Sequence, residues 1–151
     1  IASIKEIFGV EVFENEKLNK EKLAKTVFSN PKKLQQLNEI VHPLVKRDFD
    51  NWYSKQRQFP LVVKETAILF ESGSYKDCDV IITVIAPLDV RIQRIIERDK
   101  TDIENIKERI KNQWSDEMRI MKSDYVIENV YIKNAISQID KILKKLINQQ
   151  K

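Results

Sequence analysis

An apolar run that leads directly into an arginine-bearing helix restricts the fold of this chain most. Residues 79–87 are mostly apolar without alternation, which is typical of a parallel strand covered on both faces, and Pro87 ends the run. The helix expected next has an apolar stripe and, roughly 120° away, a stripe of arginines: Arg91, Arg94 and Arg98. Ligands bind beyond the carboxyl ends of parallel strands, and guanidinium groups bond phosphate oxygens in pairs. The join therefore predicts one edge of a phosphate-transfer site.

The same arginines have a plainer interpretation, a solvated basic surface paired with Glu97 and Asp99. The chain carries 27 basic and 23 acidic residues, a net charge of +4, and it has no long basic block. This mixture favours anionic small molecules over nucleic acid as partners. Because Gly9 and Gly73 are the only glycines, the chain contains no glycine-rich loop that could cradle phosphate.

Length and composition bound the class of protein. A chain of 151 residues with 42% hydrophobic residues can build a core. No apolar run approaches the roughly 20 residues that span a bilayer, and the first residues lack the order of a signal peptide. A single cysteine, Cys78, agrees with a reducing compartment. These features predict a cytoplasmic protein without a membrane partner.

The first 59 residues predict a helical subdomain. Gly9 ends a first short helix, while Asn19 and Asn30 are suited to cap the next two. We expect Leu23, Val27 and Phe28 to share the apolar face of the second helix. The third helix is predicted to stop before Pro43, because proline disfavours continuation and suits the first turn of a fourth helix.

The remainder of the chain predicts an α/β sheet. Residues 60–70 form a β-rich run and residues 71–73 a turn before the strand at 79–87, and residues 125–127 form a further short strand. Thr101 and Glu104 have the spacing of a capping box, which predicts a charged helix beginning there. The final helix has an apolar stripe: Ile132, Ile136, Ile139, Leu143 and Leu146.

Three further residues could carry chemistry. His42, the sole histidine, has an unperturbed pKa suited to proton transfer, but no serine or cysteine nucleophile lies near it in the sequence, so a structural or substrate-contacting role is favoured. Glu71 lies near the predicted crevice and could reach a hydroxyl, or could be a cap or salt-bridge partner. Asn129 follows the last strand and could bond a purine edge or serve as a turn residue.

The order of these motifs resembles dephospho-coenzyme A kinase, a P-loop kinase family of the nucleoside-monophosphate-kinase type. The resemblance covers nearly the whole chain. In sequence order it consists of Leu18 with Leu23-Ala24 and Val27-Phe28, His42-Pro43, Leu69-Phe70-Glu71, residues 79–87 with Gln93-Arg94 and Arg98-Asp99, Gln113, and residues 123–129.

This resemblance implies a three-layer P-loop kinase fold with a parallel sheet. Residues 1–59 would form the helical subdomain that receives the coenzyme A precursor. Residues 60–99 and 123–151 would form an incomplete nucleotide-binding α/β core, and residues 100–122 the lid.

The implied reaction is phosphoryl transfer from ATP to the ribose 3'-hydroxyl of dephospho-coenzyme A, with Mg2+ bridging phosphates. Arg94 and Arg98 would be catalytic and face the ATP phosphates. Arg94 and Asn129 would bind ATP, with Asn129 beside the adenine. The acceptor would lie against Lys20, His42 and Glu71. No protein metal ligand is predicted, and no oligomeric state.

The chain departs from the family pattern in two places and lacks one part of it. Ala67 stands where the family commonly has proline, and Lys20 replaces a frequent arginine. The family's first strand, its phosphate loop and its acidic residue are not in this sequence, a segment of roughly 40 to 50 residues by the size of such a unit. We expect this chain to be the later part of a kinase and to be inactive alone.

Two other functions are open at this point. One is a different small-molecule P-loop kinase, acting on a nucleoside, a nucleotide or a shikimate-like acceptor. The other is a non-enzymatic helical module whose basic faces bind RNA or an acidic protein.

Overall fold

The computed structural model describes residues 2–149 of the chain. The chain divides into two compact units, whose described residues are 2–59 and 60–149. Each unit has its own small apolar cluster. Among the described residues, no helix has the length and apolar character needed to cross a membrane.

The first unit begins with a helix and a hairpin. Helix α1 (Ala2–Phe8) ends at Gly9, whose φ of 76° is the left-handed conformation that glycine adopts without strain. Strands β1 (Phe13–Glu14) and β2 (Lys17–Leu18) then pair antiparallel. The sequence analysis did not predict this hairpin, because each strand is two residues long and its Asn15-Glu16 turn lacks the usual glycine despite positive φ at both residues.

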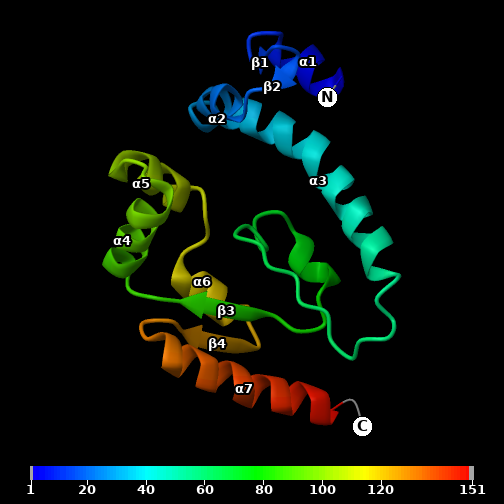
Figure 1. Ribbon diagram of the computed structural model, residues 1–151, viewed down its shortest axis with the longest axis vertical. Coiled ribbons are helices and arrows are strands. Elements are labelled where there is room, and N and C mark those ends of the chain that lie inside the picture. The colour runs from blue at the N-terminus through cyan, green and yellow to red at the C-terminus, as the bar shows by residue number, and fades with distance from the viewer. Residues whose placement is uncertain (1, 150–151) are drawn as a thin grey trace. The chain divides into compact units, whose positions relative to one another are not determined.

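Two capped helices complete the first unit. Helix α2 (Lys20–Phe28) is capped by Asn19, whose side chain accepts the N–H groups of Glu21 and Lys22, and Asn30 caps α3 in the same way. The apolar cluster is formed by Phe8, Val12, Leu23 and Val27. Figure 1 shows α1 and α2 against the N-terminal half of the long helix α3.

Helix α3 (Pro31–Tyr53) contradicts the prediction of a break before Pro43, because it continues through that residue. Proline lacks one N–H and disturbs the helix only locally, so helical bonds continue on both sides of it. Leu34, Leu37 and Ile40 pack the half that precedes Pro43 against the first apolar cluster. The prediction that Phe28 shares the buried face of α2 is also wrong, since its side chain is exposed.

The second unit is built on two parallel strands. Strand β3 (Ile82–Ile85) pairs with β4 (Tyr125–Glu128) in the register Ile82 to Tyr125 through Ile85 to Glu128. A short 3-10 helix, η1 (Ser74–Asp77), precedes β3. Helix α4 (Leu88–Asp99) follows β3 at once, as the sequence predicted.

The run at residues 60–70 is not a strand, contrary to the prediction. Residues 61–66 have no regular structure and residues 67–73 form turns. A strand requires a hydrogen-bonded neighbour, and within the described part of the chain none pairs with this segment. Its β-branched residues pack well in a sheet, but they form a strand only when another strand lies beside them.

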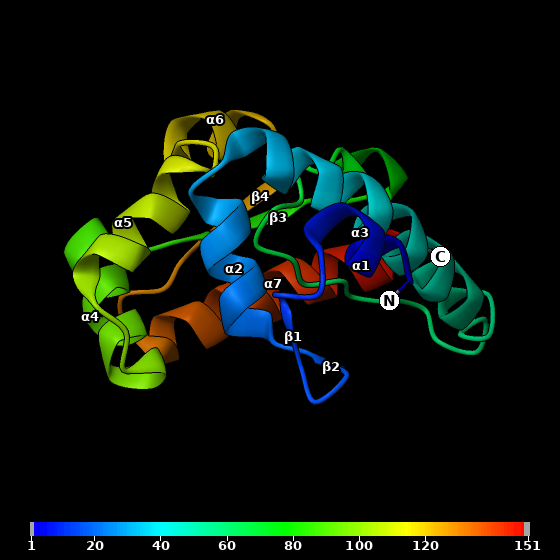
Figure 2. The ribbon, with the colours of Figure 1, turned by 90° about the horizontal axis from the view of Figure 1, so that it is seen from above.

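Two helices follow α4 around the charged segment. Helix α5 (Ile103–Lys111) lies beside α4, as Figure 2 shows, and helix α6 (Asp116–Met121) contacts β3. The expected cap of α5 is wrong by one residue: Asp102 rather than Thr101 is the cap, and its carboxylate accepts the Asn105 N–H at 2.9 Å. An aspartate one residue closer to the helix is an equally good acceptor, so spacing alone could not choose.

The terminal helix α7 (Ile132–Gln149) packs on β4 (Figure 1). It buries Ala135 and Ile142 against Ile127. The predicted stripe is therefore only partly right, since its three isoleucines are exposed while Leu146 packs on the cluster. The face of α7 that packs on the sheet is therefore the one that carries Ala135, Ile142 and Leu146.

Candidate functional site

Arg94 and Asn129 meet at the carboxyl end of the two-stranded sheet. Arg94 lies on α4 and donates from Nη1 to the Asn129 carbonyl at 2.7 Å and from Nη2 to the Val130 carbonyl at 2.8 Å. The Asn129 N–H donates to the Ile85 carbonyl at 2.8 Å, which fixes the turn against the end of β3. The arginine is exposed. It therefore presents a positive charge beside a polar turn, in the place where parallel sheets bind ligands.

Arg98 lies one turn further along α4 and makes an ion pair with its neighbour. Its Nε donates to Asp99 Oδ1 at 2.7 Å and its Nη2 to Oδ2 at 3.0 Å. This bond raises the pKa of Arg98 and lowers the pKa of the Asp99 carboxyl. Arg109 of α5 approaches the same carboxylate at 3.6 Å. The Arg98 charge is thus partly matched by Asp99 at the surface.

Arg91, the third member of the predicted stripe, joins α4 to α6. Its Nη1 and Nη2 donate to the two carboxylate oxygens of Asp116 at 3.2 and 2.8 Å, and Arg119 donates to Asp116 Oδ1. The three side chains are 28%, 27% and 18% exposed, in the order Arg91, Asp116, Arg119. Arg91 therefore serves the packing of two helices.

Glu71 contacts the linker between α5 and α6. Its Oε1 accepts the Trp114 N–H at 2.5 Å. The Phe70 ring stacks on the Trp114 ring with centroids 5.1 Å apart and planes 10° apart, and Gln113 Nε2 lies 3.4 Å from the Ala67 carbonyl. Glu71 thus holds the backbone of the linker directly before the Ser115 cap of α6.

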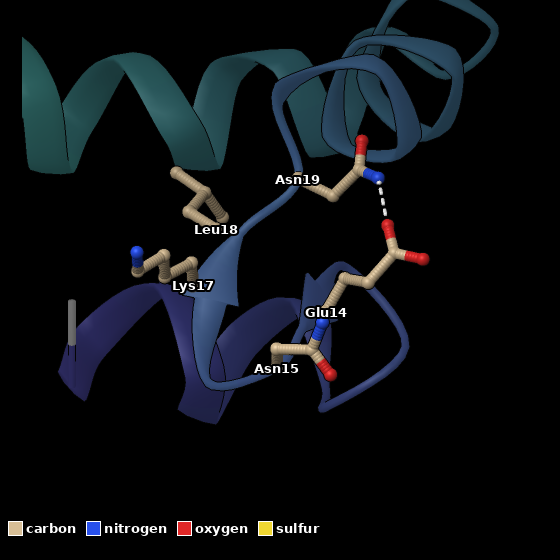
Figure 3. A pocket seen from close by; sticks show the side chains of 5 residues that line it. All are labelled: Glu14, Asn15, Lys17, Leu18 and Asn19. Atoms are coloured by element: carbon tan, nitrogen blue, oxygen red, sulfur yellow. Dashed lines mark hydrogen bonds between the residues drawn. The ribbon is translucent and has the colours of Figure 1, made fainter.

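The other two predicted residues, Lys20 and His42, belong to the first unit. Lys20 is the exposed first residue of α2, and His42 is half-buried within α3 directly before Pro43. A pocket opens at the hairpin that precedes α2, where Asn19 Nδ2 donates to Glu14 Oε2 at 2.7 Å. Figure 3 marks this hydrogen bond with a dashed line. Its lining residues are Glu14, Asn15, Lys17, Leu18 and Asn19.

The charges of the second unit suit an anionic ligand better than a bare metal ion. Arg94 is exposed at the carboxyl edge of the sheet, and Arg98 follows it on the same helix. Among the residues that the structure describes, no group of three or more histidine, cysteine, aspartate or glutamate side chains could hold a metal ion. Arginine forks match the oxygens of phosphate and bind them in pairs.

Trp114, Asp116 and Arg119 hold separate segments of the second unit together, and the sequence did not indicate this role. Their partners lie 25 to 43 residues away along the chain, or are shared through Asp116. Neither the periodicity nor the spacing of residues predicts contacts between positions so far apart in the sequence. One feature of the sequence could have indicated a tertiary contact here: the large aromatic Trp114 directly precedes the Ser115 cap, in a segment that otherwise consists of charged helices.

Comparisons with known proteins agree on one family. The family model described as dephospho-CoA kinase matches residues 1–134. A curated dephospho-CoA kinase of Bacteroides fragilis (strain YCH46) is 40% identical over 134 residues, which are 89% of this chain and 65% of the relative. A dephospho-CoA kinase of Fusobacterium nucleatum is 41% identical over 123 residues, 81% of this chain and 63% of the relative. The chain thus spans less than two thirds of the length of these relatives.

Two solved structures are similar in fold. A Thermus thermophilus crystal structure aligns with a TM-score of 0.85 and 28% identity, over 95% of this chain and 74% of that one. The dephospho-CoA kinase of Campylobacter jejuni aligns with a TM-score of 0.65 and 21% identity, over 98% of this chain and 77% of that one. The predicted α/β P-loop kinase fold is confirmed. From the extent of the family match, together with relatives above 30% identity, the chain belongs to the dephospho-CoA kinase family.

Proposed function

We propose that the complete protein containing this chain transfers a phosphoryl group from ATP to the ribose 3'-hydroxyl of dephospho-coenzyme A, the last step of coenzyme A biosynthesis. The observation that carries this proposal is the family match over residues 1–134. The meeting of Arg94 and Asn129 at the carboxyl edge of the sheet supports it, because α/β folds bind ligands at this edge and a guanidinium group can bind phosphate.

In this proposal the second unit binds ATP. Arg94 and Arg98 stabilise the charge that develops on the transferred phosphoryl group, and Asn129 borders the adenine. Such a transfer depends on positioning and charge stabilisation, which arginines on a fixed helix supply. Mg2+ would be held mainly by phosphate oxygens, as is usual for nucleotide-bound magnesium.

The acceptor is assigned to the residues expected from the family. Lys20 and His42 of the helical segment 1–59 would bind dephospho-coenzyme A, with Glu71 on the core side. Residues 60–99 and 123–151 would form the nucleotide-binding core and residues 100–122 the lid. We place the reaction in the cytoplasm.

We further propose that these 151 residues alone do not catalyse the transfer. With Gly9 and Gly73 as its only glycines, the chain has no loop that could cradle the ATP phosphates. The activity therefore belongs to the complete protein.

The decisive experiment is an acceptor screen with the complete protein, ATP and Mg2+. Dephospho-coenzyme A is expected to give the highest kcat/KM by a wide margin over nucleosides, nucleotides and shikimate. A higher value for another acceptor would make the protein a different small-molecule kinase. Absence of ATP-dependent phosphorylation together with salt-sensitive RNA binding would instead support a binding module.

A further inference from the structure

The linker between α5 and α6 is held by a turn that lies more than 40 residues earlier in the chain. Three contacts join them. The Phe70 and Trp114 rings stack, the Trp114 N–H donates a hydrogen bond to Glu71, and the Gln113 side-chain amide donates one to the Ala67 carbonyl. We name the turn at residues 67–73 and the linker at residues 112–115 together the turn–linker contact.

The turn side of this contact is fixed in place. Phe70 is 5% exposed and also packs against Tyr75, with ring centroids 5.5 Å apart. The Gly73 N–H donates to the Phe70 carbonyl, and the Ser72 hydroxyl donates to the Leu69 carbonyl. A displacement of Trp114 must therefore move the whole turn or break the stack.

The linker side of the contact is connected to helix α4, which carries Arg94 and Arg98. Helix α5 ends at Lys111 and contacts α4, where Arg109 approaches Asp99. On the other side of the linker, Asp116 of α6 accepts both Arg91 Nη groups. The linker thus lies between two connections to the helix that carries Arg94.

We propose that Trp114 is a positioning residue that couples the two substrate sites, because it joins the Glu71 turn to the linker whose flanking helices α5 and α6 both contact the arginine-bearing helix α4. This inference rests on the proposed function, in which Glu71 borders the acceptor. Trp114 fits this role because it offers two independent connections, a ring to Phe70 and a backbone N–H to Glu71. Coupling of this kind is a free energy shared between two binding equilibria, so it can be measured directly.

The test measures the affinity of the complete protein for dephospho-coenzyme A by calorimetry, with and without a saturating non-hydrolysable ATP analogue and Mg2+. The ratio of the two dissociation constants is the coupling factor. We expect a factor of about five or more for the wild type, as is typical of coupled sites. Trp114→Ala should bring the factor close to one, whereas Trp114→Phe, which keeps an aromatic ring and the backbone N–H, should retain most of it.

A second pair of variants removes the other connection. Glu71→Ala deletes the acceptor of the Trp114 N–H and should also lower the factor, whereas Glu71→Gln keeps an oxygen that can accept and should restore it. If Trp114→Ala does not fold, Trp114→Leu takes its place, because it removes the ring stack with Phe70 but keeps an apolar side chain. A merely structural contact would lower the melting temperature of the alanine variants and leave the coupling factor of the folded protein unchanged.

The outcomes separate this inference from the proposed function. A wild type that binds neither ligand refutes both. A wild type that binds both ligands and phosphorylates dephospho-coenzyme A, with a coupling factor of one or a factor that both alanine variants retain, refutes the role of Trp114 alone.

Discussion

Arg91, Arg94 and Arg98 lie on one face of α4, yet each has different partners. Arg91 binds Asp116, Arg94 binds two main-chain carbonyls, and Arg98 binds Asp99. The sequence predicted the shared face correctly, but it treated the three side chains as one group. Only the tertiary neighbours distinguish them, and these neighbours place Arg94 beside Asn129 at the carboxyl edge of the sheet.

Replacing Arg94 by alanine in the complete protein should lower kcat roughly 100-fold or more, because a stabiliser of transition-state charge is lost. Steady-state kinetics with dephospho-coenzyme A measures the effect. Lys144→Ala, which removes an exposed charge from α7, is the matched control and should leave kcat unchanged. An Arg94→Ala variant with the turnover of this control would reject the catalytic assignment.

The Arg98–Asp99 pair should make the stability of the fold depend on pH. Its hydrogen bond favours the charged carboxylate, so the pKa of Asp99 in the folded chain lies below the ordinary aspartate value. The pair therefore stabilises the fold above the unfolded pKa of Asp99, and this contribution disappears as the pH falls through the folded pKa. Carboxyl NMR titration should show the low pKa, and Arg98→Gln should raise it.

Arg109 provides a graded comparison at the same carboxylate. It lies at 3.6 Å and acts on Asp99 only through its charge, so Arg109→Gln should raise the pKa of Asp99 less than Arg98→Gln does. The reverse order would show that the Arg98 hydrogen bond is not the dominant cause.

Local signals placed most helix ends of this chain. Asn19 and Asn30 cap the helices that they were predicted to cap, since a side-chain oxygen beside free N–H groups acts within one turn. Where a choice depended on distant residues, local rules failed: α3 passes through Pro43, and residues 60–70 form no strand. The hairpin at residues 13–18 was missed because its turn lacks glycine.

The cap of α5 can be assigned by mutation. Asp102→Ala should lower the free energy of unfolding by about 1 kcal/mol, because the Asn105 N–H loses its acceptor. Thr101→Ala is the matched control, and it should change stability by only a few tenths of a kcal/mol, as surface substitutions usually do. Urea denaturation measures both changes. A larger loss for Thr101→Ala would restore the capping box expected from the sequence.

At the scale of the whole molecule, the second unit relies on polar contacts as well as on its core. Its described apolar cluster consists of Ile127, Ala135 and Ile142, and its sheet has two strands. A two-stranded sheet is marginal without covering elements, so contacts between helices contribute to its cohesion. The fold class could be predicted from the order of helices and strands along the sequence, whereas these contacts between helices could not.

Asp116 holds two guanidinium groups in a half-buried position, and Asp116→Asn removes the negative charge that both of them contact. We expect a loss of roughly 1–2 kcal/mol in the free energy of unfolding, smaller than for a fully buried pair because all three side chains reach solvent. Chemical denaturation checks this value. Asp140→Asn, the same change at an exposed position of α7, should be nearly neutral, and an equal loss there would show that the shared carboxylate is not special.

The stacked ring of Trp114 also has an optical consequence. The chain has two tryptophans, Trp52 in the first unit and Trp114 in the second. A Trp52→Phe variant would leave a single indole emitter, packed against Phe70, whose fluorescence reports on the second unit alone. The complementary Trp114→Phe variant would report on α3, so the sequence carries one intrinsic spectroscopic label for each half of the molecule.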